Sequence, residues 1–310
     1  MASVTADVPR ATGSLRRRRD SQIAWIFSAP ALILLTVFLL IPFVLAIYLS
    51  FTDQRLVPGP LATRFVGARN YLRLLEDATL QRALFNNFLF ALIIVPVQSA
   101  FALFLAILVN QKLRGITAFR TIFFSPVVTT MAVIAIVWAF LYNPEQGLIN
   151  ALLRSLSFGA FQPVDWLGDT RLAFPAIMFM SIWQGVGFQM IIFLAGLQEI
   201  PEALYEASSI DGAGTWSQFT SITLPQLRNT LIFVGVSTTI MAFKLFTQVE
   251  VMTKGGPQDS TVTTVLHIVQ QGFRRQTVGY ASAVAVVFFV IVLIISIIQR
   301  RVVVEESQVA

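Results

Sequence analysis

The stretch YEASSIDGAGTWSQFTSITLP, from Tyr205 to Pro225, is a polar segment that lies between two long apolar segments of the chain. Its first seven residues contain two carboxyl groups and three hydroxyl groups, and two glycines follow them. Polar groups of this kind are costly inside a hydrocarbon environment. The stretch therefore predicts a structured loop at one face of a membrane, with the chain crossing the membrane before and after it.

Local sequence signals predict two short helices in this loop. Pro201 suits a first helical position, where its missing N–H has no consequence, and the acids that follow favour a helix start. Gly212 and the next glycine can end this helix in the left-handed conformation. Thr215 and Gln218 have the spacing of a capping box for the second helix. Pro225 is expected to break the chain before the next apolar segment.

The composition of the whole chain is typical of a membrane protein. Of the 310 residues, 56% are hydrophobic and only 12% are charged, whereas soluble domains contain about 25% charged residues. The net charge of +6 is better explained by topology signals beside membrane spans than by nucleic-acid binding. The absence of cysteine and the single histidine, His267, exclude disulfides, thiolate metal sites and a histidine-rich metal cluster. We assign no role to His267, because a lone histidine more often makes a local hydrogen bond.

Six apolar stretches of about 20 residues each predict six transmembrane helices and an all-α membrane protein. The first is longer than the bilayer requires, so we expect it to tilt or protrude. In the loop after it, Leu72, Leu75 and Leu80 recur near helical spacing and predict a short amphipathic helix. The six predicted spans are Ala24–Phe51, Asn87–Val109, Phe119–Leu141, Leu172–Ala195, Leu231–Val251 and Tyr280–Ile298.

Basic residues predict that both termini lie in the cytoplasm. Four arginines, Arg16–Arg19, precede the first span, and Arg300 and Arg301 follow the last. The short connection that contains Lys112, Arg114 and Arg120 fits the same side. The opposite loop, residues 52–86, contains five arginines, which runs against this rule.

The predicted topology divides the chain into three parts. We expect residues 1–23 to form a basic cytoplasmic segment and residues 300–310 a cytoplasmic tail. Residues 24–299 would form one transmembrane domain, with the loop 197–228 on the cytoplasmic side.

The spacing within the opening stretch resembles the cytoplasmic loop of bacterial ABC importer permeases. That pattern is Glu-Ala-Ala, three residues, Gly, nine residues, Ile, one residue and Leu-Pro. One residue departs from it: Ser208 stands for the second alanine and is small enough to preserve close packing. The matching residues are Glu206, Ala207, Ser208, Gly212, Ile222, Leu224 and Pro225.

The resemblance extends over nearly the whole chain. FVGARNYLRLL is similar to the first outer loop of the family, FRTIFFSPVVTTMAV to its third span and WQGVGFQMIIFLAGLQEIP to its fourth. VMTKGGPQDST is similar to the outer loop before the last span in the first membrane subunit of maltose- and glycerol-phosphate-type importers. The resemblance implies the type I importer permease architecture in a bacterial cytoplasmic membrane.

The family resemblance also implies partners. They are a second, homologous permease, two ATP-binding subunits and an extracytoplasmic solute-binding protein, which would contact Gly255, Gly256 and Pro257. No G-x-x-x-x-G-K-[ST] motif occurs in the chain, so ATP and Mg²⁺ are expected on the ATP-binding subunits, with no cofactor, catalytic residue or metal on this chain. The coupling residues implied by the resemblance are Glu206, Ala207, Ser208, Asp211, Gly212, Leu224 and Pro225.

Two groups of residues are candidates for the substrate path. Lys244 is an ionisable residue within the fifth span, and Gln248 lies on the same helical face; the alternative is a lysine that extends to the membrane surface. The fourth span contributes aromatic and amide side chains, which suit sugars, although they can equally serve helix packing. The candidates are Trp183, Gln184, Gly185, Phe188, Gln189, Met241, Lys244, Leu245 and Gln248.

An ion-coupled secondary transporter is the competing class. Such carriers often contain acidic residues within their spans, but no Asp or Glu lies deep in a predicted span here, and Glu250 is at an edge. An intramembrane enzyme would need a set of catalytic groups that the spans lack. We therefore expect an importer permease for a di- or oligosaccharide, with glycerol phosphate or a polyol as the alternative substrate.

Overall fold

The computed structural model describes residues 13–57, 62–111 and 115–305, and within them the chain is almost entirely helical. One isolated antiparallel bridge, between Thr52 and Phe65, occurs in this part of the chain. The predicted all-α architecture is confirmed. Residues 1–12 and 306–310, which belong to the predicted cytoplasmic ends, and the basic residues Lys112 and Arg114 lie outside the described residues.

Five segments of the described chain are long and apolar enough to cross a membrane, and a bent helix pair makes a sixth if it counts as one span. The first segment consists of α1 (Gly13–Leu35), the π-helical segment η1 (Thr36–Leu40) and α2 (Ile41–Ser50). The bent pair is α5 (Ile116–Val128) and α6 (Met131–Leu141). The other spans are α4 (Ala78–Asn110), α8 (Ala173–Gln198), α12 (Arg228–Phe243) with α13 (Thr247–Met252), and α15 (Val278–Glu305).

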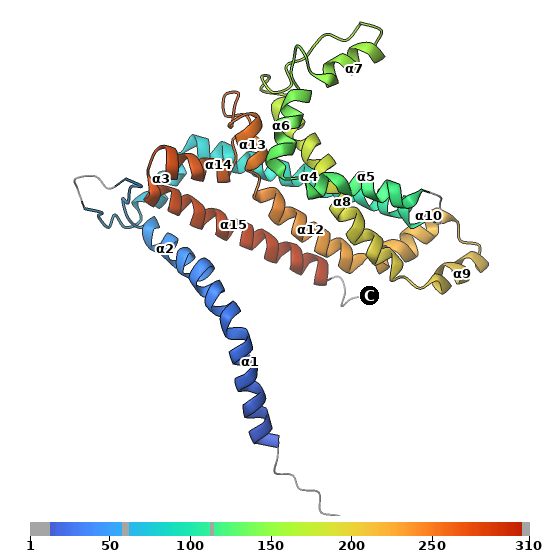
Figure 1. Ribbon diagram of the computed structural model, residues 1–310, viewed down its shortest axis with the longest axis horizontal. Helices are drawn as coiled ribbons and strands as arrows, with labels where there is room; N and C mark the ends of the chain where they lie inside the picture. Colours follow the sequence, from blue (N-terminus) through green and yellow to red (C-terminus); the bar gives the residue numbers. More distant parts are fainter. Residues whose placement is uncertain (1–12, 58–61, 112–114, 306–310) are drawn as a thin grey trace, which may run out of the picture.

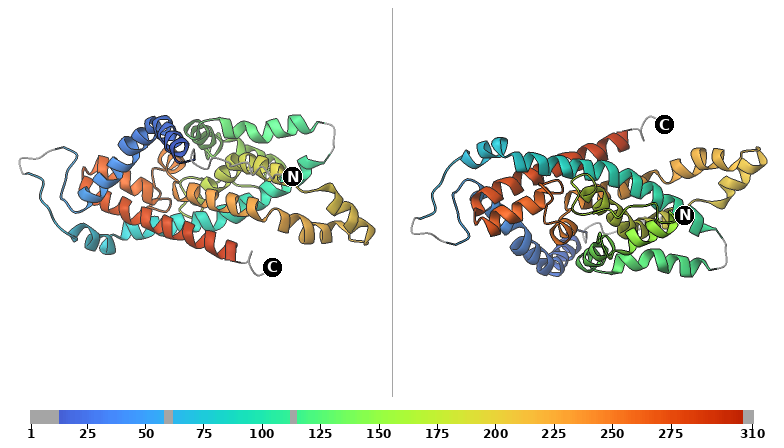
Figure 2. Two further views of the ribbon diagram at one scale, coloured as in Figure 1. Left: turned by 90° about the horizontal axis from the view of Figure 1, so that it is seen from below. Right: turned by 90° about the horizontal axis from the view of Figure 1, so that it is seen from above.

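The pair α4 and α8 forms the centre of the bundle, and α12 packs against both (Figures 1 and 2). Phe90, Ile177 and Phe243 meet in one buried cluster of this core. The helix α4 begins well before the predicted Asn87, because Asp77 caps it: Asp77 Oδ1 accepts a hydrogen bond from the Leu80 N–H at 3.0 Å.

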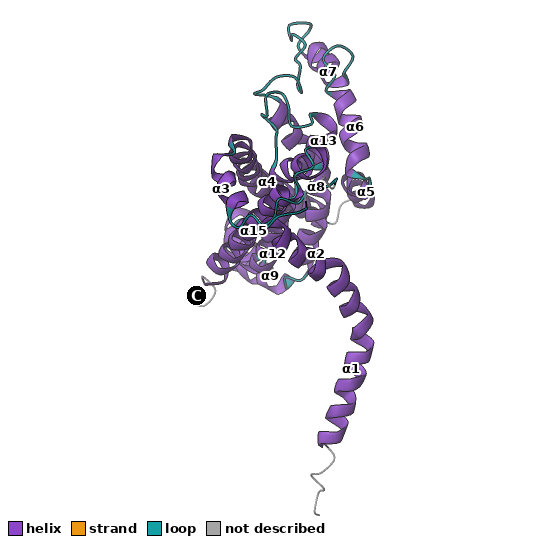
Figure 3. Cartoon of the chain, turned by 90° about the vertical axis from the view of Figure 1, so that its left-hand side faces the viewer, coloured by secondary structure: helices purple, strands orange, loops and turns teal. Residues whose placement is uncertain are grey.

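The first span leaves the bundle instead of packing within it (Figures 1 and 3). No residue in its most apolar window is buried, and Trp25 and Phe27 are 66% and 81% exposed. Only its second half has a partner, since α2 packs on α15 and the rings of Phe43 and Phe289 lie 4.9 Å apart. The first span therefore leaves the bundle with an apolar surface that the described chain does not cover, and its expected tilt in, or protrusion from, the bilayer stays a prediction.

The third span is not the single straight helix predicted from Phe119 to Leu141. The axes of α5 and α6 differ by 101°, and the extended residues Thr129 and Thr130 join them. Pro126 lies in the last turn of α5. Because proline provides no N–H for the helical ladder, the helix weakens at this point and the chain turns.

The fifth span is also interrupted, which the continuous apolar run from Leu231 to Val251 did not predict. The helix α12 ends at Phe243, and α13 starts at Thr247 after three residues that are not helical. Phe246, within this break, has φ −145° and ψ −61°.

The end of the bundle near residue 50 has further short helices, α3 (Arg69–Glu76), α14 (Thr264–Val269) and the π-helical η3 (Gln270–Arg274). The predicted amphipathic helix is confirmed as α3, but its packing face differs. Leu72 and Leu75 are exposed, whereas Leu74 is buried against α15. Leu80, which the prediction placed in the same helix, belongs to α4 and is buried there. A further helix, α7 (Leu148–Leu156), projects from the bundle beyond α6 (Figure 1).

His267 makes the kind of local hydrogen bond expected of a lone histidine. It is 2% exposed, and its Nε2 lies 3.1 Å from Asp77 Oδ2, which also accepts the Tyr280 hydroxyl at 2.6 Å. Burial lowers the pKa of His267, and the neighbouring Asp77 carboxylate opposes this effect only in part. The cluster ties the starts of α4 and α15 to α14.

Candidate functional site

A helical hairpin follows α8 at the end of the bundle opposite α3 (Figure 1). The predicted pair of helices is confirmed, with shifted boundaries. Pro201 precedes the first helix as its N-cap, and Pro225 lies within a helical turn, so the chain breaks at Leu227 instead. Proline is tolerated in a first helical turn, which explains the shift. The segments are α9 (Glu202–Ile210), α10 (Thr215–Gln218), the π-helical η2 (Phe219–Thr223) and α11 (Leu224–Gln226).

Gly212 ends α9 in the left-handed conformation that the sequence predicts, with φ +79°. The N–H of Ala213 donates to Ser208 O at 2.9 Å, and the N–H of Gly212 donates to Ser209 O at 3.1 Å. These two bonds define a Schellman motif, which satisfies the last carbonyls of the helix. Open space surrounds the position where a Cβ of residue 212 would lie, so the backbone conformation alone favours glycine there.

The predicted capping box of Thr215 and Gln218 does not form. Gly214 is the N-cap of α10 and Thr215 is its first residue. The Nε2 of Gln218 instead reaches across the hairpin to Ser208 Oγ at 3.0 Å, Ser209 Oγ at 2.9 Å and Tyr205 O at 3.3 Å. Gln218 therefore joins the two helices, and Ser208 supplies an acceptor that an alanine at this position would lack.

The base of the hairpin is fixed to the membrane helices. The hydroxyl groups of Tyr205 and Thr223 lie 2.9 Å apart. Leu227 is fully buried in a cluster with Leu197 of α8 and Val234 of α12. Because the hairpin is held internally and its base is packed in the core, a displacement of the hairpin must move α8 and α12.

The surface of the hairpin combines acidic and large apolar groups. Ile210 and Trp216 are 87% and 75% exposed, although Trp216 stacks near Phe219 at 5.5 Å. Most predicted coupling residues share this exposure: Glu206, Ala207, Asp211, Gly212 and Pro225 are exposed, and Ser208 and Leu224 are half-buried.

The link through Gln218 gives a first prediction. Gln218→Ala should loosen the hairpin, since it removes hydrogen bonds with a net contribution of about 1 kcal/mol each. Since about 1.4 kcal/mol corresponds to a tenfold change in an equilibrium constant, we expect amide hydrogen exchange at Gly212 and Ala213 to accelerate by at least about tenfold. Gln226→Ala, at an exposed position in α11, is the matched control and should leave exchange unchanged. Equal protection in both variants would contradict the role of Gln218.

The candidates on α8 divide between packing positions and exposed positions. Gln189 is buried and its Nε2 donates to Thr238 Oγ1 of α12 at 2.5 Å, and Gly185 packs against the side chain of Gln98 in α4. In contrast, Trp183 and Phe188 are both 42% exposed, while Gln184 is half-buried.

Trp183 also faces the bend of the third span. Its ring lies 5.4 Å from that of Trp138 in α6. Both tryptophans line a cavity of about 280 Å³, together with Pro126 and Thr129 at the bend. An aromatic wall beside an interrupted helix is a suitable surface for the ring of a sugar.

Side chains from other segments stabilise the break in the fifth span. The Nδ2 of Asn87 in α4 donates to Phe243 O at 3.3 Å, and the Oγ1 of Thr263 donates to Leu245 O at 2.8 Å. Asn87 Oδ1 also accepts the N–H of Thr264 at 2.8 Å. Irregular backbone at membrane depth requires such partners. Sequence reasoning missed Asn87 and Thr263; the polar Asn87 at the edge of an apolar run was the available signal.

The break brings the fifth-span candidates to different environments. Lys244 and Met241 are exposed and Gln248 is half-buried, whereas Leu245 is 2% exposed and belongs to the core. Within the described residues Lys244 forms no ion pair. Met241 lies on α12, which contacts α8, whereas Gln248 lies on α13, which packs on α6.

The turn that contains Gly255, Gly256 and Pro257 is tightly held. Gly255 is buried with φ +94°, and the peptide bond between Gly256 and Pro257 is cis. Thr261 Oγ1 donates to Gly256 O at 2.8 Å. The side chains presented to solvent around this turn are those of Lys254, Gln258 and Asp259.

A bundle of membrane-length helices with a helical hairpin at one end is typical of a multi-pass membrane protein. Residues 98–304 match the family described as binding-protein-dependent transport system inner membrane component, and the chain belongs to this family. It is therefore an integral membrane permease subunit of an ABC importer, in agreement with the predicted class. Within the described residues no group of three or more acidic, histidine or cysteine side chains could hold a metal ion.

Relatives and solved structures support this assignment. The chain is 33% identical to the diacetylchitobiose uptake permease NgcF of Streptomyces coelicolor, over 90% of this chain and 83% of that protein. It is 34% identical to the lactose transport permease LacF of Rhizobium radiobacter, over 88% and 91% of the two chains. Its fold matches a chain of a bacterial ABC transporter that imports alginate, with a TM-score of 0.80, 21% identity and coverage of 94% and 99%.

Proposed function

We propose that this chain is one of two membrane subunits of an ATP-driven, binding-protein-dependent importer whose solute is a di- or oligosaccharide. The observation that carries the proposal is the hairpin, which exposes Ile210 and Trp216 beside Glu206 while its base is anchored to α8 and α12. Exposed apolar side chains on a rigid element indicate a docking surface. The relatives NgcF and LacF, which are named for diacetylchitobiose and lactose, support a sugar as the solute.

The occupant of the hairpin surface is an ATP-binding subunit, present in two copies in the complex. ATP and Mg²⁺ bind there, and hydrolysis moves the hairpin. Glu206 and Asp211 provide the charged contacts, and Gly212 allows the turn. Because the hairpin moves as a unit, its motion reaches α8 and α12, whose exposed side chains form the candidate path.

A second, homologous permease completes the path. The first span presents Trp25 and Phe27 without a partner in the described chain, and the substrate candidates Trp183 and Phe188 are exposed at the surface of one subunit. A polar solute requires these faces to be enclosed. The outer turn at Gly255–Pro257 contacts a solute-binding protein; a related importer of alginate has been crystallised with its periplasmic protein.

The topology follows from the hairpin. We propose that it faces the cytoplasm within the loop 197–228, with residues 24–299 as the membrane domain. The end of α15 lies toward the hairpin end of the bundle (Figures 1 and 2). The basic segment 1–23 and the tail 300–310 are then cytoplasmic as well.

Reconstitution tests this function. The chain should be co-expressed with its second permease, its ATPase and its solute-binding protein and placed in proteoliposomes. We expect vanadate-sensitive uptake of a disaccharide that depends on ATP and on the binding protein. Uptake driven by an ion gradient without ATP would reject the proposal, and so would transport by this chain alone.

Lys244 favours one alternative solute, because an exposed ammonium group in a helix break suits a phosphate such as glycerol phosphate. Lys244→Met distinguishes the two. If the solute is a neutral sugar, the variant loses one hydrogen bond and uptake should fall by about fivefold. If the solute carries a phosphate, the variant leaves that charge unpaired and uptake should fall by more than about a hundredfold. Lys244→Arg, which keeps the positive charge at this position, is the control and should retain most of the uptake. Unchanged uptake in the Lys244→Met variant would remove this residue from the path.

A further inference from the structure

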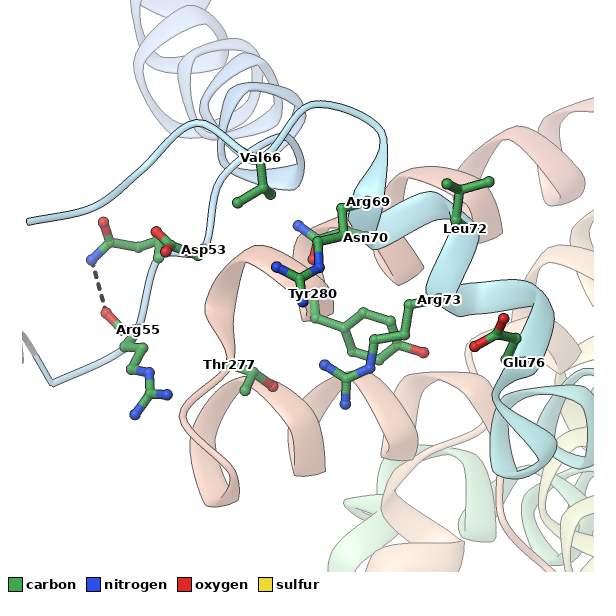
Figure 4. A pocket seen from close by; sticks show the side chains of 11 residues that line it. Asp53, Arg55, Val66, Arg69, Asn70, Leu72, Arg73, Glu76, Thr277 and Tyr280 are labelled. Carbon is green, nitrogen blue, oxygen red and sulfur yellow. Dashed lines mark hydrogen bonds between the residues drawn. The ribbon is translucent and has the colours of Figure 1, made fainter. Parts of the chain in front are cut away.

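A cavity with a volume of about 680 Å³ lies at the end of the bundle opposite the hairpin (Figure 4). Its walls come from three segments: the chain directly after α2, the helix α3 and the start of α15. Three of the lining residues are arginines, Arg55, Arg69 and Arg73. They belong to the outer loop whose positive charge runs against the usual distribution of basic residues beside spans.

The walls of this cavity are fixed. The N–H of Gly279 donates to Gln54 O at 3.0 Å, and the N–H of Leu56 donates to Gln276 O at 3.0 Å. Asn70 Nδ2 donates to the carbonyls of Ser50 and Thr52, both at 2.8 Å. The cavity therefore exists in the folded chain without a ligand to order it.

The arginines of the cavity are available to bind an anion. In the part of the chain that the structure describes, none of the three forms an ion pair. Arg73 is held over the ring of Tyr280, 4.3 Å from the centroid, which orients its guanidinium without using its N–H donors. The three arginines outnumber the two acids in the lining, Asp53 and Glu76, and Asp53 already accepts the Arg64 N–H at 2.6 Å.

The position of the cavity indicates the source of the anion. Asp53, Gln54 and Arg55 follow the end of the first span directly, and Thr277 and Tyr280 lie at the start of the last span. Lipid headgroups occupy this depth of a membrane. The segments that carry the arginines also expose apolar side chains, of which Leu72 lines the cavity; the others are Leu56, Val57, Phe65 and Leu75.

We propose that this cavity binds the headgroup of an anionic phospholipid from the leaflet opposite the hairpin. The arginines Arg55, Arg69 and Arg73 bind the phosphate through charge-assisted hydrogen bonds. The apolar side chains around the rim contact the acyl chains. Glu76 has no partner among the described hydrogen bonds and ion pairs, and it accepts hydrogen bonds from headgroup hydroxyls, so phosphatidylglycerol fits the lining. This site depends on the fold and not on the identity of the transported solute.

Native mass spectrometry of the full chain in detergent tests the proposal. The chain should be supplied with equal amounts of phosphatidylglycerol, phosphatidylethanolamine or phosphatidylcholine, and retained lipid counted. We expect preferential retention of phosphatidylglycerol. Each Arg→Gln change at positions 55, 69 and 73 should weaken it by about fivefold, which corresponds to the usual contribution of one basic residue near an anionic membrane surface.

Controls separate this site from general charge effects and from misfolding. Arg64→Gln changes an exposed arginine of the same loop that does not line the cavity and should leave lipid retention unchanged. Arg69→Gln alone leaves the stacked Arg73 in place, so it tests the site with the least structural change. The triple variant combines Arg55→Gln, Arg69→Gln and Arg73→Gln. Equal retention of the three lipids by the unmodified chain, or unchanged retention of phosphatidylglycerol by the triple variant, would overturn the proposal.

Two further outcomes would also overturn it. If soluble glycerol phosphate displaces phosphatidylglycerol at matched concentration, the cavity takes a free phosphate ester and not a lipid. If the triple variant keeps its lipid but loses affinity for the solute-binding protein, the arginines serve a protein partner.

Discussion

Gly212→Val is expected to leave the chain inserted in the membrane and to uncouple it from ATP hydrolysis. Residue 212 has φ +79°, a conformation that costs an ordinary L-residue about 1–2 kcal/mol and a β-branched residue more. A valine would therefore drive the turn out of the left-handed region and break the Schellman motif. Because α9 and α10 would no longer be held at their present angle, we expect solute-stimulated ATPase activity to fall by about tenfold or more. A strain energy of about 1.4 kcal/mol corresponds to a tenfold change.

The chain offers a matched control in Gly214. It lies two residues further on, also has open space at its Cβ position, and has φ −75°, which any residue adopts. Gly214→Val should couple almost normally. The ATPase activity of Gly212→Asn should lie between those of Gly212→Val and Gly214→Val, since asparagine tolerates the left-handed conformation better than other residues.

The measurement is ATPase activity of the reconstituted complex, with co-purification of the ATPase subunit and solute affinity of the binding protein measured in parallel. The affinity of the binding protein for its solute should be unaffected. Normal coupling in Gly212→Val would mean that the hairpin is only a connector between spans, and the proposed function would lose its main support.

Gly187→Ala is expected to damage the membrane bundle itself. A Cβ at this position would lie 2.0 Å from the carbonyl oxygen of Phe123 in α5 and 2.8 Å from its carbonyl carbon. Backbone atoms cannot rotate away as a side chain can, so α5 must separate from α8. Overpacking of this kind costs about 1–3 kcal/mol, and the loss of close contact along the pair adds to it.

Thermal unfolding in detergent measures this effect, and we expect the midpoint to fall by several degrees, on the order of 2–4 °C per kcal/mol for a chain of this size class. Gly235→Ala, in α12, is the control, because nothing lies within 4 Å of its Cβ position. Similar midpoints for both variants would show that α5 and α8 are separable.

The features that could be predicted from the sequence are those set by local signals. The spacing from Glu206 to Pro225 predicts the hairpin, and Gly212 predicts its left-handed turn. Apolar run length predicts the positions of the spans, although not their ends: the cap at Asp77 starts α4 outside the apolar run. Pro126 is a local signal for the bend in the third span. The length of the apolar run from Phe119 to Leu141 outweighed this signal and led to the prediction of one straight helix.

The features that could not be predicted depend on contacts between distant segments. Gln218 has the spacing of a capping box, but its amide finds better partners on α9, ten residues away in the case of Ser208. The break at Lys244 has no glycine or proline to indicate it. It exists because Asn87 and Thr263 satisfy the carbonyls that it releases, and pattern reasoning along one segment does not detect such pairs.

The hydrogen bond between Thr263 and Leu245 O has a mechanical consequence. Thr263 follows closely after the turn at Gly255–Pro257, and Leu245 adjoins Lys244 in the break. If the proposed solute-binding protein presses on this turn, the hydrogen bond from Thr263 would transmit the displacement to the backbone of the break in the fifth span without bending α12. Asn87 of α4 contacts both segments that this hydrogen bond joins. Its side chain donates to Phe243 O before the break and accepts the N–H of Thr264 after the turn. The turn at Gly255–Pro257 is therefore linked to the break in the fifth span by a short series of hydrogen bonds.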